Sequence, residues 1–218
     1  MLLRFESNGP HRHRRVTLNT STLAADRKTL RSALRAKRRA VPAAERARVA
    51  KLIARHVSRA FPLGSGARVA LYASLPEELD TSALIDLARR RRWQIYMPRI
   101  DHRRRGRRMQ FVLMSESHRR NRLGILEPIG GRTLSPRHFD IVFLPILGFD
   151  AQGVRLGTGG GYYDRAFAFR RWRTAWHAPR LIGVAYAFQQ VESIGAAPHD
   201  VLLDAVVTER GIIQCATG

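Results

Sequence analysis

The first part of the chain carries apolar residues at the spacing of amphipathic helices. A stripe of leucines predicts a helix over residues 23–40, and Pro42 ends it because proline lacks the N–H that an inner helical turn requires. A second apolar stripe predicts another helix that reaches Ala60. Residues 1–22 show no such periodicity. We therefore expect a disordered basic extension over 1–22 and a single domain over 23–218.

Short apolar runs replace the helical spacing in the rest of the chain. They predict strands at 69–72, 93–97, 109–113, 141–147, 181–186, 205–208 and 212–214. We expect Pro98 to stop the second strand, and helices to follow Thr81 and to cover 162–169. Strands that are apolar throughout and alternate with helices are typical of a mostly parallel sheet with helices on both faces. The expected fold is one Rossmann-like, three-layer α/β domain with an N-terminal helical pair.

The composition is strongly basic, with 39 Lys and Arg against 17 Asp and Glu, a formal net charge of +22. Such a charge favours a nucleic-acid-binding module. However, nearly all the basic residues are arginines in scattered runs, such as Arg103–Arg108, and no aromatic residues interleave with them as a single-strand stacking platform requires. We expect no specific nucleic-acid partner.

Cysteine usage and hydropathy limit the cellular context. Cys215 is the single cysteine and cannot form an internal disulfide. No apolar run approaches the roughly 20 residues of a membrane span. We expect a monomeric, cytoplasmic protein with no membrane partner.

The most informative segment follows the strongest predicted strand and reads GFDAQGVRLGTGGGYYDR, residues 148–165. Its glycines permit positive φ and let successive N–H groups converge on an anion. Arg155 can chelate phosphate oxygens, and Asp164 suits a Mg²⁺ that bridges phosphates. The segment lacks the Gly-Lys-Ser/Thr of a Walker A loop, and Tyr162 stands where the dinucleotide fingerprint requires glycine. A flexible glycine turn is the simpler alternative.

The motif RLGTGGGYYD resembles the signature of the 5-formyltetrahydrofolate cyclo-ligase family. Further segments fall in the family's order, so that the resemblance spans about residues 27–210. They are RKTLRSALRAKRRAV at 27–41, SLPEELDTSALI at 74–85, MPR at 97–99, LGILEP at 123–128, AYAFQ at 185–189 and PHDVLLDAVVTE at 198–209. Leu123 departs from the family, where an aromatic residue is common, and so does Ile146, where a Pro-Gly pair is often found.

The resemblance implies ATP- and Mg²⁺-dependent closure of 5-formyltetrahydrofolate, with or without a polyglutamate tail, to 5,10-methenyltetrahydrofolate with release of ADP and phosphate. It implies catalytic roles for Arg155, Tyr162 and Asp164, and metal ligands at Asp164 and Asp204. The implied ATP-binding residues are Arg27, Lys28, Arg31, Arg155, Leu156, Gly157, Thr158, Gly159, Gly160, Gly161, Tyr162 and Tyr163. The implied folate-binding residues are Arg31, Ala73, Glu78, Glu127 and Tyr162.

Several of these residues have ordinary structural explanations when they are taken alone. The basic residues of the first helix suit a solvated face, Glu78 a helix start, and Asp204 a strand or helix cap. Two other classes also remain open, the nucleic-acid-binding module and another Rossmann-like nucleotide-dependent enzyme. Neither accounts for the ordered set of motifs.

Overall fold

The computed structural model describes residues 20–100, 108–115, 118–120, 126–172 and 178–216. The helices are α1 Thr20–Arg39, α2 Ala43–Ala60, α3 Ser82–Arg90 and α4 Tyr162–Ala166, with 3₁₀ turns η1 Pro136–His138, η2 Ala168–Trp172 and η3 Ala187–Gln189. The strands are β1 Arg68–Ala70, β2 Gln94–Ile100, β3 Met109–Leu113, β4 His118–Arg120, β5 Leu126–Pro128, β6 Thr133–Leu134, β7 Ile141–Pro145, β8 Gly148–Phe149, β9 Arg155–Leu156, β10 Arg180–Val184, β11 Ala205–Thr208 and β12 Gly211–Gln214. Residues 1–19 of the expected extension lie outside the described residues, whereas residues 20–22, which were also assigned to it, belong to the first turn of α1.

Eight of the described strands form one sheet in the order β12-β11-β10-β7-β1-β2-β3-β6. The five central strands, from β11 to β2 in this order, pair in parallel. The outer pairs β12–β11, β2–β3 and β3–β6 are antiparallel. The expected mostly parallel α/β sheet is therefore confirmed, and the Rossmann-like comparison stays a prediction.

The expectation that Pro98 stops the second strand was wrong. Strand β2 continues through Pro98 to Ile100, with Pro98 opposite Phe111 of β3. On its other side β2 pairs with β1 only as far as Tyr96. Beyond that residue no β1 carbonyl requires a donor, so proline is tolerated as it is on an edge strand.

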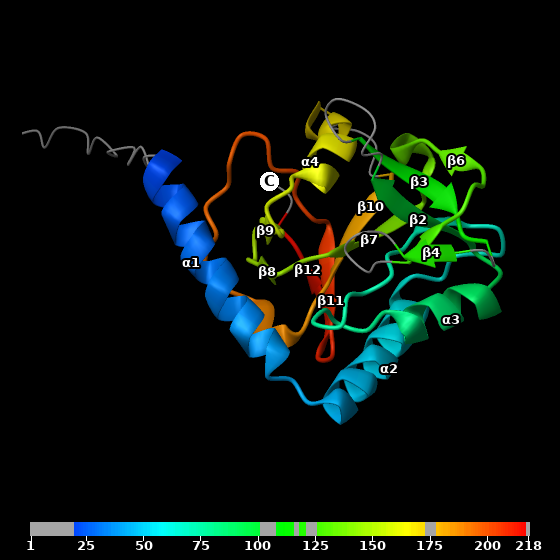
Figure 1. The fold of residues 1–218 in the computed structure, drawn as a ribbon, viewed down its shortest axis with the longest axis horizontal. Helices are drawn as coiled ribbons and strands as arrows, with labels where there is room; N and C mark the ends of the chain where they lie inside the picture. The colour runs from blue at the N-terminus through cyan, green and yellow to red at the C-terminus, as the bar shows by residue number, and fades with distance from the viewer. Residues whose placement is uncertain (1–19, 101–107, 116–117, 121–125, 173–177, 217–218) are drawn as a thin grey trace, which may run out of the picture.

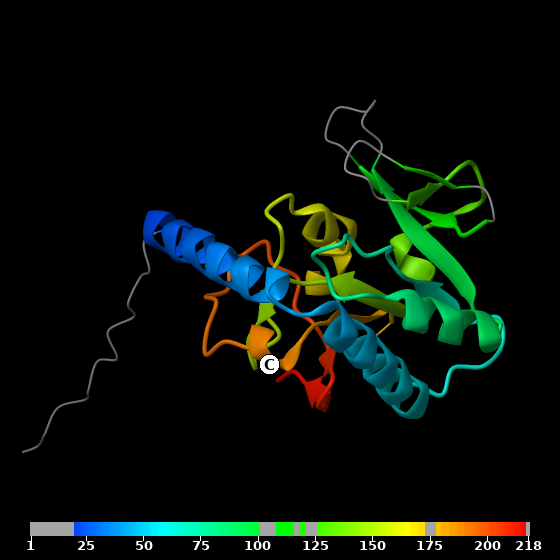
Figure 2. The same cartoon turned by 60° about the horizontal axis from the view of Figure 1, so that its bottom comes forward.

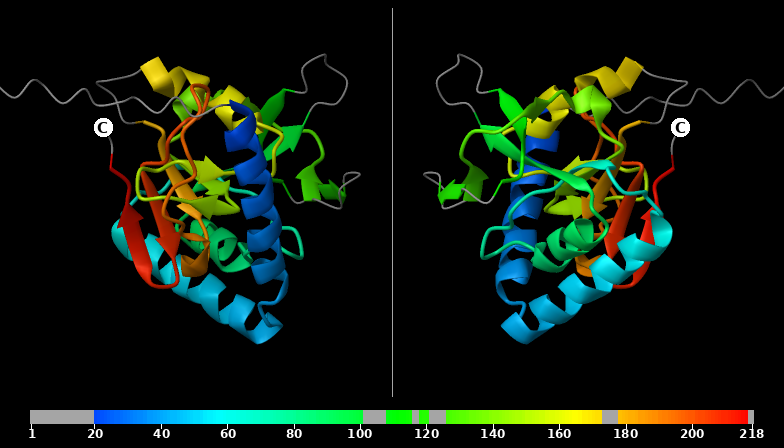
Figure 3. Two further views of the ribbon diagram at one scale, coloured as in Figure 1. Left: turned by 90° about the vertical axis from the view of Figure 1, so that its left-hand side faces the viewer. Right: turned by 90° about the vertical axis from the view of Figure 1, so that its right-hand side faces the viewer.

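The sheet separates two apolar layers, because successive strand residues point to opposite faces. On one face, Val69, Ile141 and Ile182 pack with α2 and α3. On the other, Val142 and Leu181 pack with the aromatic residues that follow α4. Figures 1 and 3 show α2 and α3 on one side of the sheet and α4 on the other. The helices cover both faces, as the strand pattern predicted.

The chain reverses its direction of progress across the sheet between β1 and β7, which are parallel neighbours. From β1 it crosses through α3 to β2 on one side. From β7 it passes through α4 to β10 on the other side. The connections that leave the carboxyl ends of β1 and β7 therefore run in opposite directions. This is a topological switch point, the place where open α/β sheets bind ligands.

Helix α1 lies apart from the two layers, on the side of the β8–β9 hairpin (Figure 2). Leu34 is 2% exposed and packs with Leu147 and Leu156 in a third, smaller core. A Cβ at Gly148 would lie 2.7 Å from Leu34 Cδ1, so a larger residue would require the buried Leu34 side chain or α1 to move. Helix α1 is therefore attached to the segment that leads into the glycine-rich loop.

Candidate active site

A cleft of about 370 Å³ opens at the switch point. Tyr72 and Ala73 follow β1, and Pro145 ends β7; all three line the cleft. The glycine-rich loop of residues 157–161 forms another wall. The glycine-rich segment that follows the strongest predicted strand therefore lies at the carboxyl ends of the strands and lines this cleft.

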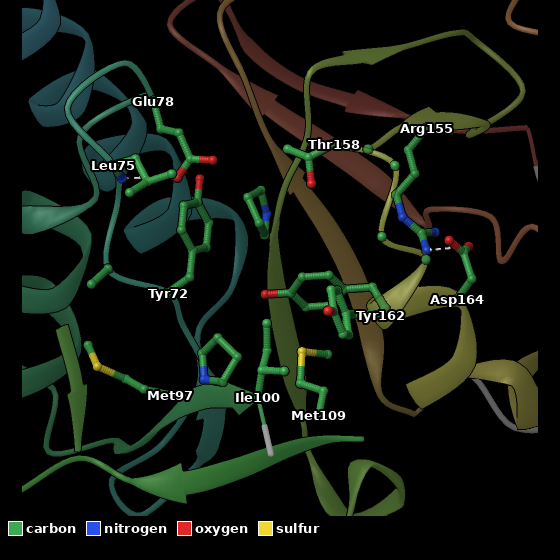
Figure 4. Close-up of a pocket in the computed structure, with 18 of the residues that line it drawn as sticks. Tyr72, Leu75, Glu78, Met97, Ile100, Met109, Arg155, Thr158, Tyr162 and Asp164 are labelled. Atoms are coloured by element: carbon green, nitrogen blue, oxygen red, sulfur yellow. Dashed lines mark hydrogen bonds and ion pairs between the residues drawn. The ribbon is translucent and has the colours of Figure 1, made fainter. Parts of the chain in front are cut away.

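One end of the cleft carries Glu78 (Figure 4). Its carboxylate Oε2 accepts a hydrogen bond from the Leu75 N–H at 3.0 Å, and the Tyr72 ring lies beside it. The Thr81 hydroxyl donates to the Tyr72 carbonyl at 2.7 Å, which fixes the turn between β1 and α3. Glu78 is only 9% exposed, and this burial raises the pKa of its carboxyl, opposed by the Leu75 N–H and by the charge of Arg38.

The middle of the cleft is apolar. Met97, Pro98 and Ile100 on β2 and Met109 on β3 line it, and the side chains of Met97, Ile100 and Met109 surround its lower part in Figure 4. The continuation of β2 beyond Pro98 therefore forms part of this wall. Tyr162 reaches the same space from the start of α4, and the Arg165 guanidinium lies 5.0 Å from its ring centroid. An apolar wall of this kind suits a flat ring system.

The opposite end consists of the glycine-rich loop. Gly159 and Gly161 have φ values of +108° and +60°, which other residues rarely adopt. A Cβ at Gly160 would lie 2.5 Å from the Tyr162 ring, whereas one at Gly157 would meet no atom within 4 Å. The loop thus presents nearly bare backbone, together with Thr158, to the cleft.

Arg155 and Asp164 bracket this loop and are paired with each other. Arg155 is 7% exposed, and its guanidinium donates to Asp164 Oδ1 at 2.5 Å and to the Val201 carbonyl. The Val201 N–H donates to the same Asp164 oxygen at 3.1 Å. Burial lowers the pKa of Arg155, opposed mainly by the charges of Asp164 and Asp200. The pair ties both ends of the loop to the segment before β11.

Helix α1 reaches the loop with its arginines. Arg31 Nε donates to the Gly157 carbonyl at 3.0 Å. Arg27 pairs with Asp200 at 2.5 Å and donates to the Gly195 carbonyl, and Lys28 is exposed. Arg31 therefore contacts the site directly, whereas Arg27 braces the neighbouring loop.

Comparison with known proteins agrees with this arrangement. The family model described as the 5-formyltetrahydrofolate cyclo-ligase family matches residues 23–209. The chain belongs to the 5-formyltetrahydrofolate cyclo-ligase family. The 5-formyltetrahydrofolate cyclo-ligase of Haemophilus influenzae is 30% identical over 186 residues, 83% of this chain and 97% of the relative. That of Escherichia coli is 31% identical over 178 residues, 80% and 96% of the two chains.

The solved structures add the fold. The NMR structure of the Aquifex aeolicus 5,10-methenyltetrahydrofolate synthetase superposes with a TM-score of 0.73 at 26% identity, covering 88% of this chain and 94% of that one. The Mycoplasma pneumoniae enzyme of the same name superposes with a TM-score of 0.66 at 23% identity, over 84% and 99% of the chains. The resemblance that the glycine-rich motif indicated is confirmed at the level of the family.

Of the other residues to which the family resemblance assigned a role, some line the cleft and others do not. Tyr163 lines the cleft, stacks on Phe167 with ring centroids 6.4 Å apart, and burial raises the pKa of its phenol. Leu156 is 1% exposed in the third core, so only its backbone can serve a ligand. Glu127 lies in β5, and its side chain is outside the described residues.

The two implied metal ligands are not brought together by their contacts. Asp204 pairs with Arg170, and its other oxygen accepts from the Leu181 N–H at 2.6 Å at the start of β10. It does not line the cleft that Asp164 lines. No cluster of three or more His, Cys, Asp or Glu that could hold a metal occurs within the described ranges. A metal role for Asp204 stays a prediction.

Sequence reasoning missed several residues of the cleft. The apolar wall on β2 and β3 and the cation Arg35 of α1 were not among the candidates. Spacing offered a signal for Arg35, which lies four residues after Arg31 on the same helical face. The described part of the chain contains no helix long and apolar enough to cross a bilayer.

Proposed function

We propose that this chain catalyses ATP- and Mg²⁺-dependent closure of 5-formyltetrahydrofolate to 5,10-methenyltetrahydrofolate, with release of ADP and phosphate. The observation that carries the proposal is a cleft with two chemically different ends. Glu78 lies at one end, a loop of bare backbone at the other, and an apolar wall between them. A ligand with a hydrogen-bonding ring and a phosphorylated ligand can meet in this space.

The reaction needs activation of a weak electrophile. Transfer of the γ-phosphoryl group to the formyl oxygen breaks the bond to the bridging oxygen, whose electron pair stays with ADP. N10 then attacks the formyl carbon and loses its proton, and the carbon–oxygen bond breaks so that phosphate departs with the original formyl oxygen. Such chemistry depends on positioning and charge neutralisation rather than on a protein nucleophile.

Glu78 recognises the pterin in this proposal. A pterin presents ring and amino N–H donors, which an ionised carboxylate can accept. Its Oε2 already accepts from Leu75, which fixes the direction of the carboxylate, and each oxygen has capacity for a further donor. The apolar wall of Met97 and Ile100 then contacts the ring faces.

The loop and its brackets hold the nucleotide phosphates. Backbone N–H groups of residues 157–161 can converge on anionic oxygens, and Arg31 fixes the loop from α1. The Arg155 guanidinium has two protein acceptors, which favours a role in positioning Asp164 and the loop. Direct phosphate contact by Arg155 stays a prediction.

Asp164 suits the magnesium ion. The hydrogen bonds described for its carboxylate all fall on Oδ1, which leaves Oδ2 as the candidate ligand. A phosphate-bound Mg²⁺ typically needs only one or two carboxylates, so the absence of a larger acidic cluster from the described residues is compatible with it. When bound, the ion would neutralise charge on the phosphates.

The test is the appearance of the methenyl chromophore on incubation with ATP, Mg²⁺ and 5-formyltetrahydrofolate. One ADP and one phosphate should form for each methenyl group, and omission of any component should abolish the signal. Glu78→Gln should lose most turnover, whereas Glu45→Gln is the matched control, because Glu45 pairs with Arg48 on the surface of α2 and does not line the cleft. ATP hydrolysis without methenyl product, or equal activity of the two variants, would contradict the proposal.

A further inference from the structure

Four arginines of α1 lie on one face of the helix. Steps of four, four and three residues bring Arg27, Arg31, Arg35 and Arg38 onto the same side. Three of them are fixed by their surroundings: Arg27 by Asp200, Arg31 by the Gly157 carbonyl, and Arg38 by burial to 4% exposure. Arg35 is the member of this stripe that lines the cleft.

The Arg35 Nε is buried and finds no acceptor within the part of the chain that the structure describes. The Nε atoms of Arg27 and Arg38 are in the same condition, but of the three side chains only that of Arg35 lines the cleft, where a ligand could supply the acceptor. Glu77 Oε2 accepts from Arg39 at 2.8 Å, and the charge of Arg35 acts on Glu77 without a hydrogen bond between the two among the described contacts. A buried donor left unpaired is costly unless a ligand completes it.

The place of Arg35 is intermediate between the two ends of the cleft. Along α1 it follows Arg31, which contacts the glycine-rich loop, and precedes Arg38, whose charge acts on Glu78. Its own charge acts on both Arg31 and Glu77. The cation of Arg35 therefore lies between the glycine-rich loop and the Glu78 end of the cleft.

We propose that Arg35 is a further catalytic residue, whose guanidinium donates hydrogen bonds to the phosphoryl group during its transfer from ATP to the formyl oxygen. The inference rests on the function proposed above. In this step the bond from phosphorus to the bridging oxygen breaks, a bond from phosphorus to the formyl oxygen forms, and no proton moves. Negative charge spreads over the three equatorial oxygens, which a planar guanidinium matches better than an ammonium group.

The proposal separates chemistry from binding. Arg35→Gln should lower the single-turnover rate of methenyl formation about 10²–10³-fold, as the loss of one electrostatic contact to a transition state does in other enzymes. The Kd for 5-formyltetrahydrofolate without ATP should stay within about twofold of wild type. Arg35→Lys should recover only part of the rate, and added guanidinium should raise the rate of Arg35→Ala. Lys37→Gln is the control, because Lys37 is exposed and points away from the stripe.

The outcomes distinguish this inference from the proposed function. A wild-type chain that forms no methenyl product would overturn both. If the wild type is active and Arg35→Gln forms the product at a similar rate, the role of Arg35 is overturned and the proposed function stands. The same conclusion follows if Arg35→Gln shows a raised KM for ATP with an unchanged kcat. If Arg35→Gln has a lowered Tm, the deciding measurement is whether added guanidinium raises the rate of Arg35→Ala below the Tm of that variant. Absence of rescue under these conditions contradicts the proposal.

Discussion

Replacement of Asp164 by asparagine should damage stability and catalysis together. The side chains of Arg155 and Asp164 are 6% and 22% exposed and 2.5 Å apart. Removal of one partner from a buried charge pair costs about 3–5 kcal/mol. The substituted amide would keep an oxygen for the Val201 N–H, and water reaches the position, so we expect a loss of about 2–3 kcal/mol in the free energy of unfolding. For a chain of this size that corresponds to a fall in Tm of roughly 5–10 °C.

The assay is a double-mutant cycle. Urea unfolding and turnover are measured for Asp164→Asn, Arg155→Met and the double variant, with a Mg²⁺ titration of turnover. Coupling between the two sites should be about 1 kcal/mol or more. The control is Asp86→Asn, which breaks the exposed pair with Arg89 at 3.8 Å and should cost at most about 1 kcal/mol. A Tm for Asp164→Asn within about 1 °C of wild type, with additive variants, would refute a structural role for the pair.

Three further predictions concern other parts of the molecule. Because burial raises the pKa of Glu78, the folded state holds its proton more tightly than the unfolded chain, so the contribution of Glu78 to stability falls as pH rises from below its usual pKa of about 4.3 through the raised value. The Tm difference between Glu78→Gln and wild type should therefore shift in favour of the variant when the pH is raised from 4 to 8. Wild-type kcat/KM should fall as acid protonates Glu78. A Tm difference that does not change with pH would contradict this. Gly148→Ala should displace α1 through Leu34, lower the free energy of unfolding by about 1–3 kcal/mol and raise the KM for ATP. Gly64→Ala, with no atom within 4 Å of its Cβ, is the control and should change neither quantity. Equal urea midpoints for the two variants would contradict this prediction. Binding to DNA or RNA should be weak, independent of sequence and lost with added salt, and sub-micromolar sequence-selective binding at physiological salt would overturn that expectation.

The strands of the eight-stranded sheet, apart from β6, and the long helices were predictable because their apolar residues follow the period of each element. The β8–β9 hairpin was not, because its organisation depends on distant polar contacts. The buried Asp150 accepts hydrogen bonds from the N–H groups of Gln152 and Val154 within the hairpin and from the distant Ile194 N–H. No local pattern of hydrophobicity encodes such a turn.

The candidate site was predictable where the motif is local and not where it depends on neighbours. Glycines and an aspartate close in sequence indicated a phosphate loop. The engagement of Arg155 by Val201 and the apolar wall on β2 come from segments far along the chain. The difference for Pro98 has the same origin, since whether proline ends a strand depends on which neighbour strand needs its N–H.

Helix α1 gives the glycine-rich motif its working position without belonging to the sheet. The two faces of the sheet are covered by α2, α3 and the segment after α4, so α1 is not needed to bury them. Instead, its Leu34 packs on the β8–β9 hairpin, and β9 of that hairpin contains Arg155 and leads directly into the glycine-rich loop. The same helix then places Arg31 against Gly157. A motif of ten residues is therefore sufficient to indicate a candidate phosphate site, but the geometry of the loop depends on a helix more than a hundred residues earlier in the chain. For this reason the sequence alone could not separate the basic face of α1 from an ordinary solvated face.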